Sequence, residues 1–273
     1  MLETQQVLKK AAYVDRDGTL AVTANAPIPF PVKQALEAYP YRAIVTTKGE
    51  LRIRQDGLSL TDLIVEAGST RVLPSGEVLF EPLTVDEKNE IGQTIIRHGL
   101  DIKLAAFYPK DNPRRDKRAI LYTNTHERAI SFQRTLGHII REITLDPKYF
   151  AHQLNLLSTG MVEFALDEAR APRLRSLLPE DINCSVADFN FLVTTQGVTK
   201  GSSAIKALES EGIDPKVTVT AGDQQVDASL LTIPGVTSIA VANPALHATY
   251  YVNNPQELAV LLNQLRLGVS QIS

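Results

Sequence analysis

The chain has 273 residues, 44% of them hydrophobic and 22% charged, which is ordinary for a soluble globular protein and long enough for two domains. The formal net charge of −3 at pH 7 gives no bulk attraction for nucleic acid or anionic lipid. Residues 1–10 are polar, and no apolar run approaches the ~18 residues of a membrane helix. The single cysteine, Cys184, is typical of a reducing compartment. We therefore expect a cytoplasmic protein with neither a nucleic-acid nor a membrane partner.

The first predicted strand, residues 11–15, runs directly into two carboxylates. Asp15 and Asp17 are separated by one residue and are followed at once by Gly18-Thr19. Two neighbouring carboxylates cost energy unless a positive charge lies between them. Open α/β folds bind their ligands at the carboxyl ends of their strands. The pattern therefore predicts a metal ion at this strand end, and an anion that the metal bridges.

A calcium-binding EF-hand loop is an alternative explanation for two aspartates at this spacing. Such a loop needs glycine at its sixth position and glutamate at its twelfth. Counted from Asp15, these positions hold Leu20 and Ala26. The calcium-loop alternative is therefore excluded.

The elements that follow favour a parallel sheet. The next expected elements are a helix and two strands, at residues 32–38, 42–47 and 62–68. A strand, a crossover helix and a second strand in this order are typical of a parallel α/β arrangement. The second strand ends at Thr46, so we expect this hydroxyl at the same edge of the sheet as Asp15.

The pattern changes after residue 81. Between residues 82 and 187, short alternating runs and helical spacings follow one another in mixed order, as in an α+β domain. We interpret residues 82–187 as a domain inserted into a core formed by residues 1–81 and 188–273. The inserted block contains a basic run, residues 114–118, which is read as a solvated loop rather than a patch that recruits substrate.

The parallel-sheet pattern returns near residue 188. The remaining core strands are expected at residues 189–194, 217–220 and 237–242. Lys200 begins the helix after the first of these, Asp223 and Asp227 follow the second, and Asn243 follows the third. In a parallel sheet these side chains lie along the edge that also carries Asp15.

These residue types fit phosphoryl transfer. Asp15 can attack phosphorus and form an acyl phosphate, while Asp17 can protonate the leaving oxygen and later deprotonate water. Thr46 and Lys200 can hold the phosphoryl oxygens and balance their charge. Asp223, with Asp15 and a backbone carbonyl near Asp17, offers the oxygen ligands that Mg²⁺ prefers. The five histidines have no spacing typical of a metal site.

In this order, and over nearly the whole chain, the motifs resemble those of the haloacid dehalogenase (HAD) superfamily of phosphohydrolases. The matching segments are residues 15–19, 44–46, 197–201 and 222–223 with Asp227. The third has the form of the sugar-phosphate phosphatase branch with a type IIB cap, which includes Cof-like, sucrose-phosphatase-like and mannosyl-3-phosphoglycerate phosphatase-like proteins. That branch carries its cap between the second and third motifs, where the inserted block lies.

The resemblance implies a HAD-like Rossmannoid α/β core with a parallel sheet, plus an inserted α+β cap domain that selects the substrate. The roles it implies are nucleophile for Asp15, general acid/base for Asp17, phosphate ligand for Thr46 and Lys200, and Mg²⁺ binding for Asp15, Asp17, Asp223 and Asp227. Asp227 would support the metal through water or orient Lys200, unless it caps the following helix. Asn243 lies in a segment like the branch's closing one; it would join the phosphate-binding residues or serve as a turn residue.

Two segments depart from the branch. Val226 stands where the branch usually has asparagine before the last aspartate. The second motif continues with Thr47-Lys48 instead of Gly-Arg, and Lys48 lacks the planar fork of arginine. Thr47 is therefore an alternative to Thr46 as the phosphate ligand. These departures concern metal affinity and turnover more than the fold.

The resemblance predicts a Mg²⁺-dependent phosphatase that hydrolyses a small phosphorylated metabolite, such as a sugar phosphate, through an aspartyl-phosphate intermediate. Two alternatives remain open. One is a phosphomannomutase-like phosphotransferase, and the other is a catalytically weak regulatory protein that binds phosphate esters. The expected partner is a small-molecule phosphate ester, and the expected assembly is a monomer or a homodimer.

Overall fold

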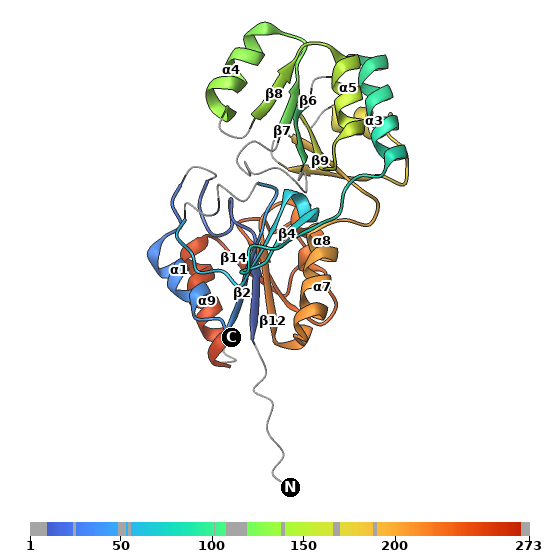
Figure 1. Ribbon diagram of the computed structural model, residues 1–273. Helices are drawn as coiled ribbons and strands as arrows, with labels where there is room; N and C mark the ends of the chain where they lie inside the picture. Colours follow the sequence, from blue (N-terminus) through green and yellow to red (C-terminus); the bar gives the residue numbers. More distant parts are fainter. Residues whose placement is uncertain are drawn as a thin grey trace. The chain divides into compact units, whose positions relative to one another are not determined.

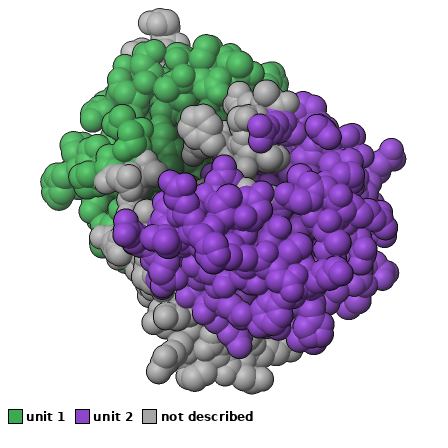
Figure 2. All heavy atoms as spheres, turned by 90° about the horizontal axis from the view of Figure 1, so that it is seen from above, with its two compact units in different colours: residues 1–78, 199–273 green, residues 79–198 purple. Residues whose placement is uncertain are grey.

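The computed structural model describes residues 10–23, 26–48, 53, 56–100, 102–107, 119–137, 140–165, 170–187 and 190–268. The chain divides into two compact units, shown in Figures 1 and 2. Residues 1–78 and 199–273 form unit 1, and residues 79–198 form unit 2. No helix in the described part of the chain is long and apolar enough to cross a membrane. The basic run at residues 114–118 lies outside the described residues.

Unit 1 is built on a mostly parallel sheet. Among the described residues, eight strands have the order β14-β13-β12-β1-β2-β3-β4-β5, and the last of them, β5, spans the boundary between the two units. Their bounds are Ala11–Val14 (β1), Tyr41–Val45 (β2), Asp62–Val65 (β3), Thr70–Val72 (β4), Val78–Phe80 (β5), Thr218–Gly222 (β12), Thr237–Val241 (β13) and Tyr250–Val252 (β14). The pairs from β14 to β3 are parallel, and β4 runs antiparallel to β3. The expected parallel sheet is therefore confirmed.

Helices cover both faces of this sheet (Figure 1). They are α1 (Phe30–Glu37), α7 (Lys200–Glu211), α8 (Ala228–Leu231) and α9 (Pro255–Leu267). Ala12 and Val14 of β1 belong to the apolar cluster under α1 and α9, whereas Ala11 and Tyr13 belong to the cluster under α7 and α8. Because strand side chains alternate between faces, Asp15 follows Tyr13 onto the α7 side. The alternation of β1 thus directs Asp15 toward the start of α7.

Unit 2 is an α+β unit with a second sheet. In the described part of the chain, six strands have the order β10-β11-β9-β6-β7-β8, with only β7 and β8 parallel. The strands are Ile102–Phe107 (β6), Ala119–Tyr122 (β7), Ile140–Thr144 (β8), Thr159–Ala165 (β9), Asn183–Ala187 (β10) and Asn190–Thr194 (β11). The helices are Val85–His98 (α3), His126–Leu136 (α4), Pro147–Leu156 (α5) and Ala171–Arg175 (α6). Apolar side chains of α3 and α5 share one cluster with those of β9 and β11.

The strand β11 lies in a different sheet from the one expected. The sequence placed residues 189–194 in the parallel core, but β11 pairs antiparallel with β9 and β10 in unit 2. A short apolar run carries no information about which sheet it joins, because its partners are chosen by tertiary packing. The two compact units divide at residues 78/79 and 198/199, and the sequence predicts domain boundaries at 81/82 and 187/188.

Candidate active site

Lys200 joins two of the predicted carboxylates. Its Nζ donates to Oδ1 of Asp15 at 2.6 Å and to Oδ1 of Asp227 at 2.5 Å. All three residues are almost fully enclosed, with exposed fractions of 5% for Asp15, 2% for Lys200 and 0% for Asp227. These residues come from the end of β1, the start of α7 and the loop after β12, so the sheet edge gathers them as the motifs predicted.

The local sequence explains why Lys200 is placed there. Thr199 caps α7, since its hydroxyl accepts from the backbone N–H of Ser202, which makes Lys200 the first helical residue. Gly201 lets α7 approach α8 closely, because a Cβ at this position would lie 2.1 Å from the carbonyl oxygen of Ser229. The Thr-Lys-Gly sequence therefore starts the helix and seats it against its neighbour.

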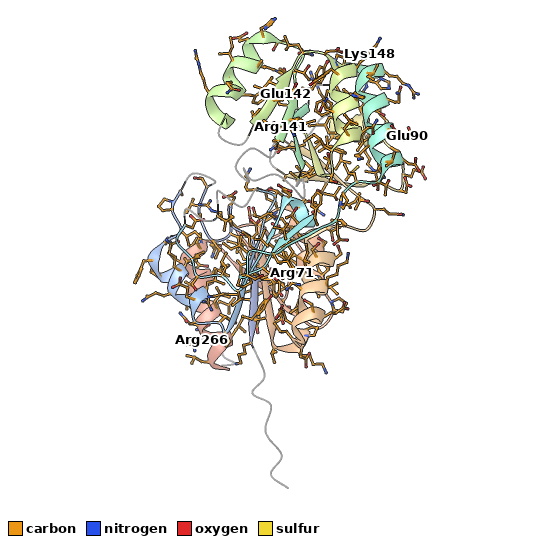
Figure 3. The ribbon with its side chains drawn as sticks, viewed as in Figure 1. Arg71, Glu90, Arg141, Glu142, Lys148 and Arg266 are labelled. Atoms are coloured by element: carbon orange, nitrogen blue, oxygen red, sulfur yellow. The ribbon has the colours of Figure 1, made fainter. Side chains whose placement is uncertain are left out.

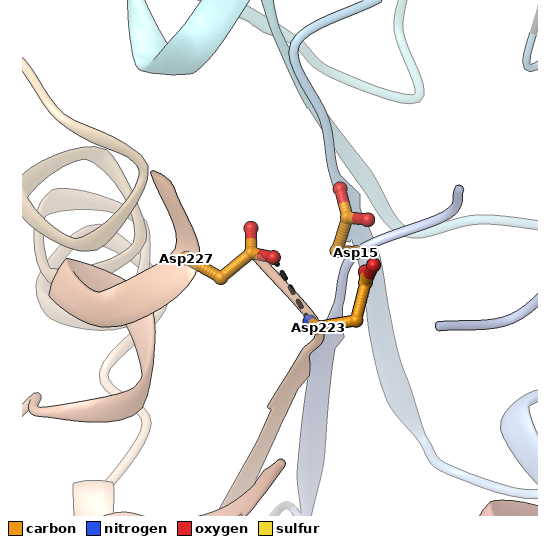
Figure 4. A group of neighbouring side chains, drawn as sticks. All are labelled: Asp15, Asp223 and Asp227. Carbon is orange, nitrogen blue, oxygen red and sulfur yellow. Dashed lines mark hydrogen bonds between the residues drawn. The ribbon is translucent and has the colours of Figure 1, made fainter. Parts of the chain in front are cut away.

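Asp227 organises the loop after β12. Its Oδ2 accepts hydrogen bonds from the backbone N–H groups of Asp223 and Gln224, each at 3.0 Å, and Figure 4 draws the first of these. With Oδ1 on Lys200, both of its oxygens have partners in the chain. The side chain makes no cap hydrogen bond to α8. Asp227 therefore orients Lys200 and the loop, rather than capping the helix that follows it.

Asp223 is held from two sides. Its Oδ1 accepts from the hydroxyl of Thr19 at 2.7 Å, and its backbone carbonyl accepts from Nδ2 of Asn243 at 2.8 Å. Gly18 has a φ of +86°, and a Cβ there would lie 2.0 Å from Oδ2 of Asp223. The glycine of the opening motif is thus required both by its backbone angle and by the close approach of Asp223.

The carboxylates of Asp15, Asp223 and Asp227 form a group that could hold a metal ion (Figure 4). One oxygen from each residue lies within 4.8 Å of the others. Hard divalent ions prefer such oxygen ligands. Because Asp227 already accepts from Lys200 and two amides, Asp15 and Asp223 are the better placed to contact an ion directly. The carboxylate of Asp17 is not a member of this group.

The charges of this group are out of balance, which also favours a cation. Burial raises the pKa of Asp15 well above its ordinary value; Lys200 opposes this rise, and the carboxylates of Asp227 and Asp223 add to it. Burial alone would lower the pKa of Lys200, but the two carboxylates that it contacts raise it instead. Lys200 contacts two of these three carboxylates, and a bound divalent cation would relieve the repulsion among them.

Asp17 has a cation of its own. Its Oδ1 accepts from Nη1 of Arg16 at 2.5 Å. The Arg16 side chain is 2% exposed and also contacts Asp56 through Nε at 2.7 Å and Nη2 at 2.8 Å. Sequence reasoning missed both of these residues. An arginine between two motif aspartates was an available signal, whereas nothing in the sequence marks Asp56.

Thr46 directly follows β2 and is 1% exposed. Its Oγ1 accepts from the backbone N–H of Lys48 at 3.1 Å, so its hydroxyl proton can still be donated to an anion. Thr47, the alternative phosphate ligand, is half-buried in the same loop. Both threonines thus lie directly after β2, at the predicted edge of the sheet.

A strained turn braces the Thr46 loop. Glu66, Ala67 and Gly68 have φ values of +55°, +56° and +104° and follow β3 directly, where the sequence predicted that the strand continues. The N–H of Ala67 donates to the carbonyl of Thr46, and the carbonyl of Gly68 accepts from the hydroxyl of Ser203. The turn therefore links the Thr46 loop to the first turn of α7. Strained backbone of this kind is often found at functional sites.

Asn243 uses its side chain on the backbone. Besides the bond from Nδ2 to the carbonyl of Asp223, its Oδ1 accepts from the N–H of Ala245 at 3.1 Å. It therefore holds the Asp223 loop and its own turn. Sequence analysis had left a phosphate-binding role and a turn role open, and these contacts favour a positioning role.

The residue before Asn243 has an unfavourable backbone conformation, which gives a stability prediction. Ala242 is exposed and has a φ of +53°, in the left-handed region that costs alanine about 1–2 kcal/mol. We expect Ala242→Gly to stabilise the protein by about 0.5–1 kcal/mol in urea denaturation, after the entropy cost of glycine. Ala38 is the matched control, because it is also exposed in unit 1 but has a φ of −73°. Ala38→Gly should destabilise, and equal losses at both positions would contradict the prediction.

Comparison with known proteins gives matches in structure but not in sequence. No protein-family model matches the sequence, and no curated protein matches it. Solved structures do match: a HAD subclass IIB sugar phosphatase shares 18% identity, with 95% of this chain and 99% of that chain covered and a TM-score of 0.72. A HAD-superfamily phosphatase from Bacteroides thetaiotaomicron shares 14% identity over 97% of this chain and 98% of its own, with a TM-score of 0.74.

A protein from Plasmodium vivax assigned as a HAD/Cof-like hydrolase shares 16% identity, with 97% of this chain and 98% of that chain covered and a TM-score of 0.74. Identities this low report on the fold. The expected α/β fold class is therefore confirmed, and the likeness extends over both units of the chain.

Proposed function

Because the chain has the HAD fold, we propose that it is a Mg²⁺-dependent phosphatase that hydrolyses a small phosphorylated metabolite, with sugar phosphates as the substrate class. The observation that carries the proposal is the buried contact of Asp15 with Lys200 beside Asp223, at the carboxyl end of β1. The phosphatases among the structural neighbours support it. The proposal excludes nucleic acid and membranes as partners.

Asp15 and Asp17 divide the proposed chemistry. A carboxylate oxygen of Asp15 attacks phosphorus, and the bond from phosphorus to the leaving oxygen breaks as Asp17 gives that oxygen a proton. Asp17 then takes a proton from the water that attacks the aspartyl phosphate. Phosphate is released and the Asp15 carboxylate is restored. Lys200 and Thr46, with Thr47 as its alternative, bind the phosphoryl oxygens throughout.

The metal would be held by Asp15, Asp223 and the backbone carbonyl of Asp17. When bound, Mg²⁺ offsets the charge of the carboxylates and of the phosphoryl group, so that two anions can approach each other. Asp227 keeps Lys200 and the Asp223 loop in place for this arrangement. We assign unit 2 as the cap that selects the substrate. The fold that this chain shares with the phosphatases does not by itself determine which phosphate ester is bound.

A phosphate-release screen tests the proposal. The purified protein is incubated with sugar phosphates, nucleotides and glycerate-linked sugar phosphates, each with Mg²⁺ or with EDTA. We expect Mg²⁺-dependent release from at least one sugar phosphate, loss of release in EDTA and its recovery when Mg²⁺ is restored. Accumulation of an isomerised sugar phosphate without free phosphate would indicate a phosphotransferase instead. Tight binding without turnover across the panel would indicate a regulatory protein.

A further inference from the structure

The two carboxylates of the opening motif are held by different cations. Asp15 contacts the ammonium of Lys200 at 2.6 Å, and Asp17 contacts the guanidinium of Arg16 at 2.5 Å. Both cations are 2% exposed, so neither is a surface charge that pairs by chance. One oxygen of each carboxylate is thereby fixed, and the two side chains are held independently of each other.

Arg16 is itself fixed by a distant part of the chain. Asp56 accepts from its Nε at 2.7 Å and from its Nη2 at 2.8 Å, in the two-pronged geometry that orients a guanidinium most strongly. Nη2 also donates to the carbonyl of Ala26 at 3.3 Å. The backbone N–H of Asp56 donates to the carbonyl of Ile53, a core residue. The backbone carbonyl of Asp56 accepts from the ammonium of Lys33 in α1. The anchor of Arg16 is therefore part of the packed unit 1.

We propose that Arg16, held by Asp56, is the positioning residue of the acid/base Asp17. The guanidinium fixes Oδ1 of Asp17, and this contact orients the carboxyl group for passing its proton to the leaving oxygen as the bond to phosphorus breaks. The inference rests on the proposed phosphatase function and deepens it. It gives the residue between the two motif aspartates a function in the proton transfer.

Two substrates whose leaving alcohols differ in acidity distinguish this role from a merely structural one. A dinitrophenolate leaves readily without a proton, whereas phenolate is a much stronger base and needs one. The ratio kcat/KM reports the steps up to the departure of the alcohol, before water attacks the aspartyl phosphate. A misplaced Asp17 should therefore slow the hydrolysis of phenyl phosphate and spare that of dinitrophenyl phosphate.

The key variant is Arg16→Lys, which keeps the charge but loses the planar fork. We expect kcat/KM for phenyl phosphate to fall by roughly 100-fold and that for dinitrophenyl phosphate by less than about threefold. Asp17→Asn gives the response of a protein that lacks the acid. Asp56→Asn is the second variant, because it leaves Arg16 in place and weakens only its anchor, and it should shift the same ratio in the same direction.

Arg71 provides a matched control. It is another buried arginine of unit 1 and is labelled in Figure 3. Its Nε contacts Asp62, the first residue of β3, at 2.6 Å. Asp62 lies at the amino end of a parallel strand, opposite the end that carries the site. Arg71→Lys should lower the melting temperature much as Arg16→Lys does. It should leave the ratio of the two kcat/KM values unchanged.

The outcomes separate the inference from the proposed function. Equal losses with both esters in folded Arg16→Lys or Asp56→Asn overturn the positioning role, while the phosphatase function stands. A wild-type protein that hydrolyses neither these esters nor any sugar phosphate overturns the function, and the inference falls with it. A shift in the ratio with the Arg16 and Asp56 variants, but not with Arg71→Lys, establishes the positioning role.

Discussion

Replacing Asp15 with asparagine is expected to lower the turnover of phosphate esters by roughly 10⁴-fold or more, because the amide cannot act as the nucleophile on phosphorus. The same variant should be more stable than the wild type in metal-free buffer at neutral pH. Burial raises the pKa of Asp15 far above its ordinary value, and the contact with Lys200 does not offset this rise. The expected result is therefore a site that loses stability by holding the proposed nucleophile in a buried position.

The sign of the effect follows from proton linkage. A carboxyl with a higher pKa in the folded protein stabilises the fold below its unfolded pKa, and this contribution is lost as the pH rises through the folded pKa. The asparagine side chain is neutral at every pH, like the protonated carboxyl group of Asp15. The stability advantage of Asp15→Asn should therefore be small in acid and grow as the pH rises toward neutrality. Thermal unfolding in EDTA, followed from acidic to neutral pH, measures this difference in stability between the variant and the wild type.

The same substitution two residues later is the control. Asp17 pairs with the buried guanidinium of Arg16, so Asp17→Asn weakens an ion pair and should not stabilise the fold. Adding Mg²⁺ should raise the melting temperature of the wild type more than that of Asp15→Asn, since the variant has lost a proposed metal ligand. Residual turnover near the wild-type level, or a variant that is less stable at neutral pH, would contradict the prediction.

The sequence predicted the position of a site residue best where a reactive side chain follows a strand. Asp15 and Asp223 lie at the ends of β1 and β12, whose apolar pattern is legible, so the parallel sheet brings them together. Lys200 begins α7, and its position was predicted correctly although the strand before it, β11, lies in the other sheet. The contact of Lys200 with both Asp15 and Asp227 is the result. Metal binding and the individual roles of these residues stay predictions until they are measured.

Features that depend on pairing between distant segments could not be predicted from the sequence. Arg16 and Asp56 lie 40 residues apart, and nothing near Asp56 marks it as the partner of a buried guanidinium. The strand β11 was assigned to the wrong sheet for the same reason, because a five-residue strand with three apolar residues is equally compatible with either sheet. The strained turn at Glu66–Gly68 was read as strand, since alanine at a positive φ violates the local preference on which a sequence-based prediction relies.

Replacing Lys200 with methionine is expected to be as damaging to stability as to activity. The substitution keeps the apolar stem but leaves the carboxylates of Asp15 and Asp227 facing each other in a buried site. Removing one partner of a buried ion pair costs about 3–5 kcal/mol, because the remaining charge is uncompensated. Urea denaturation in EDTA should show a loss of this size, and turnover should fall with the loss of a phosphate ligand.

A second substitution separates the two effects. In the double variant Lys200→Met with Asp227→Asn, the asparagine Oδ1 can still accept from the N–H groups of Asp223 and Gln224. A neutral amide at position 227 also removes the repulsion between the two facing carboxylates. Stability should then largely recover, whereas turnover should stay low because the ammonium proposed to bind the phosphoryl oxygens is missing. Recovery of both, or of neither, would show that Lys200 does not act as the shared partner of the two carboxylates. Recovery of stability alone would assign two purposes to the Lys200 ammonium: it makes a buried pair of aspartates tolerable, and it keeps the proposed nucleophile in position.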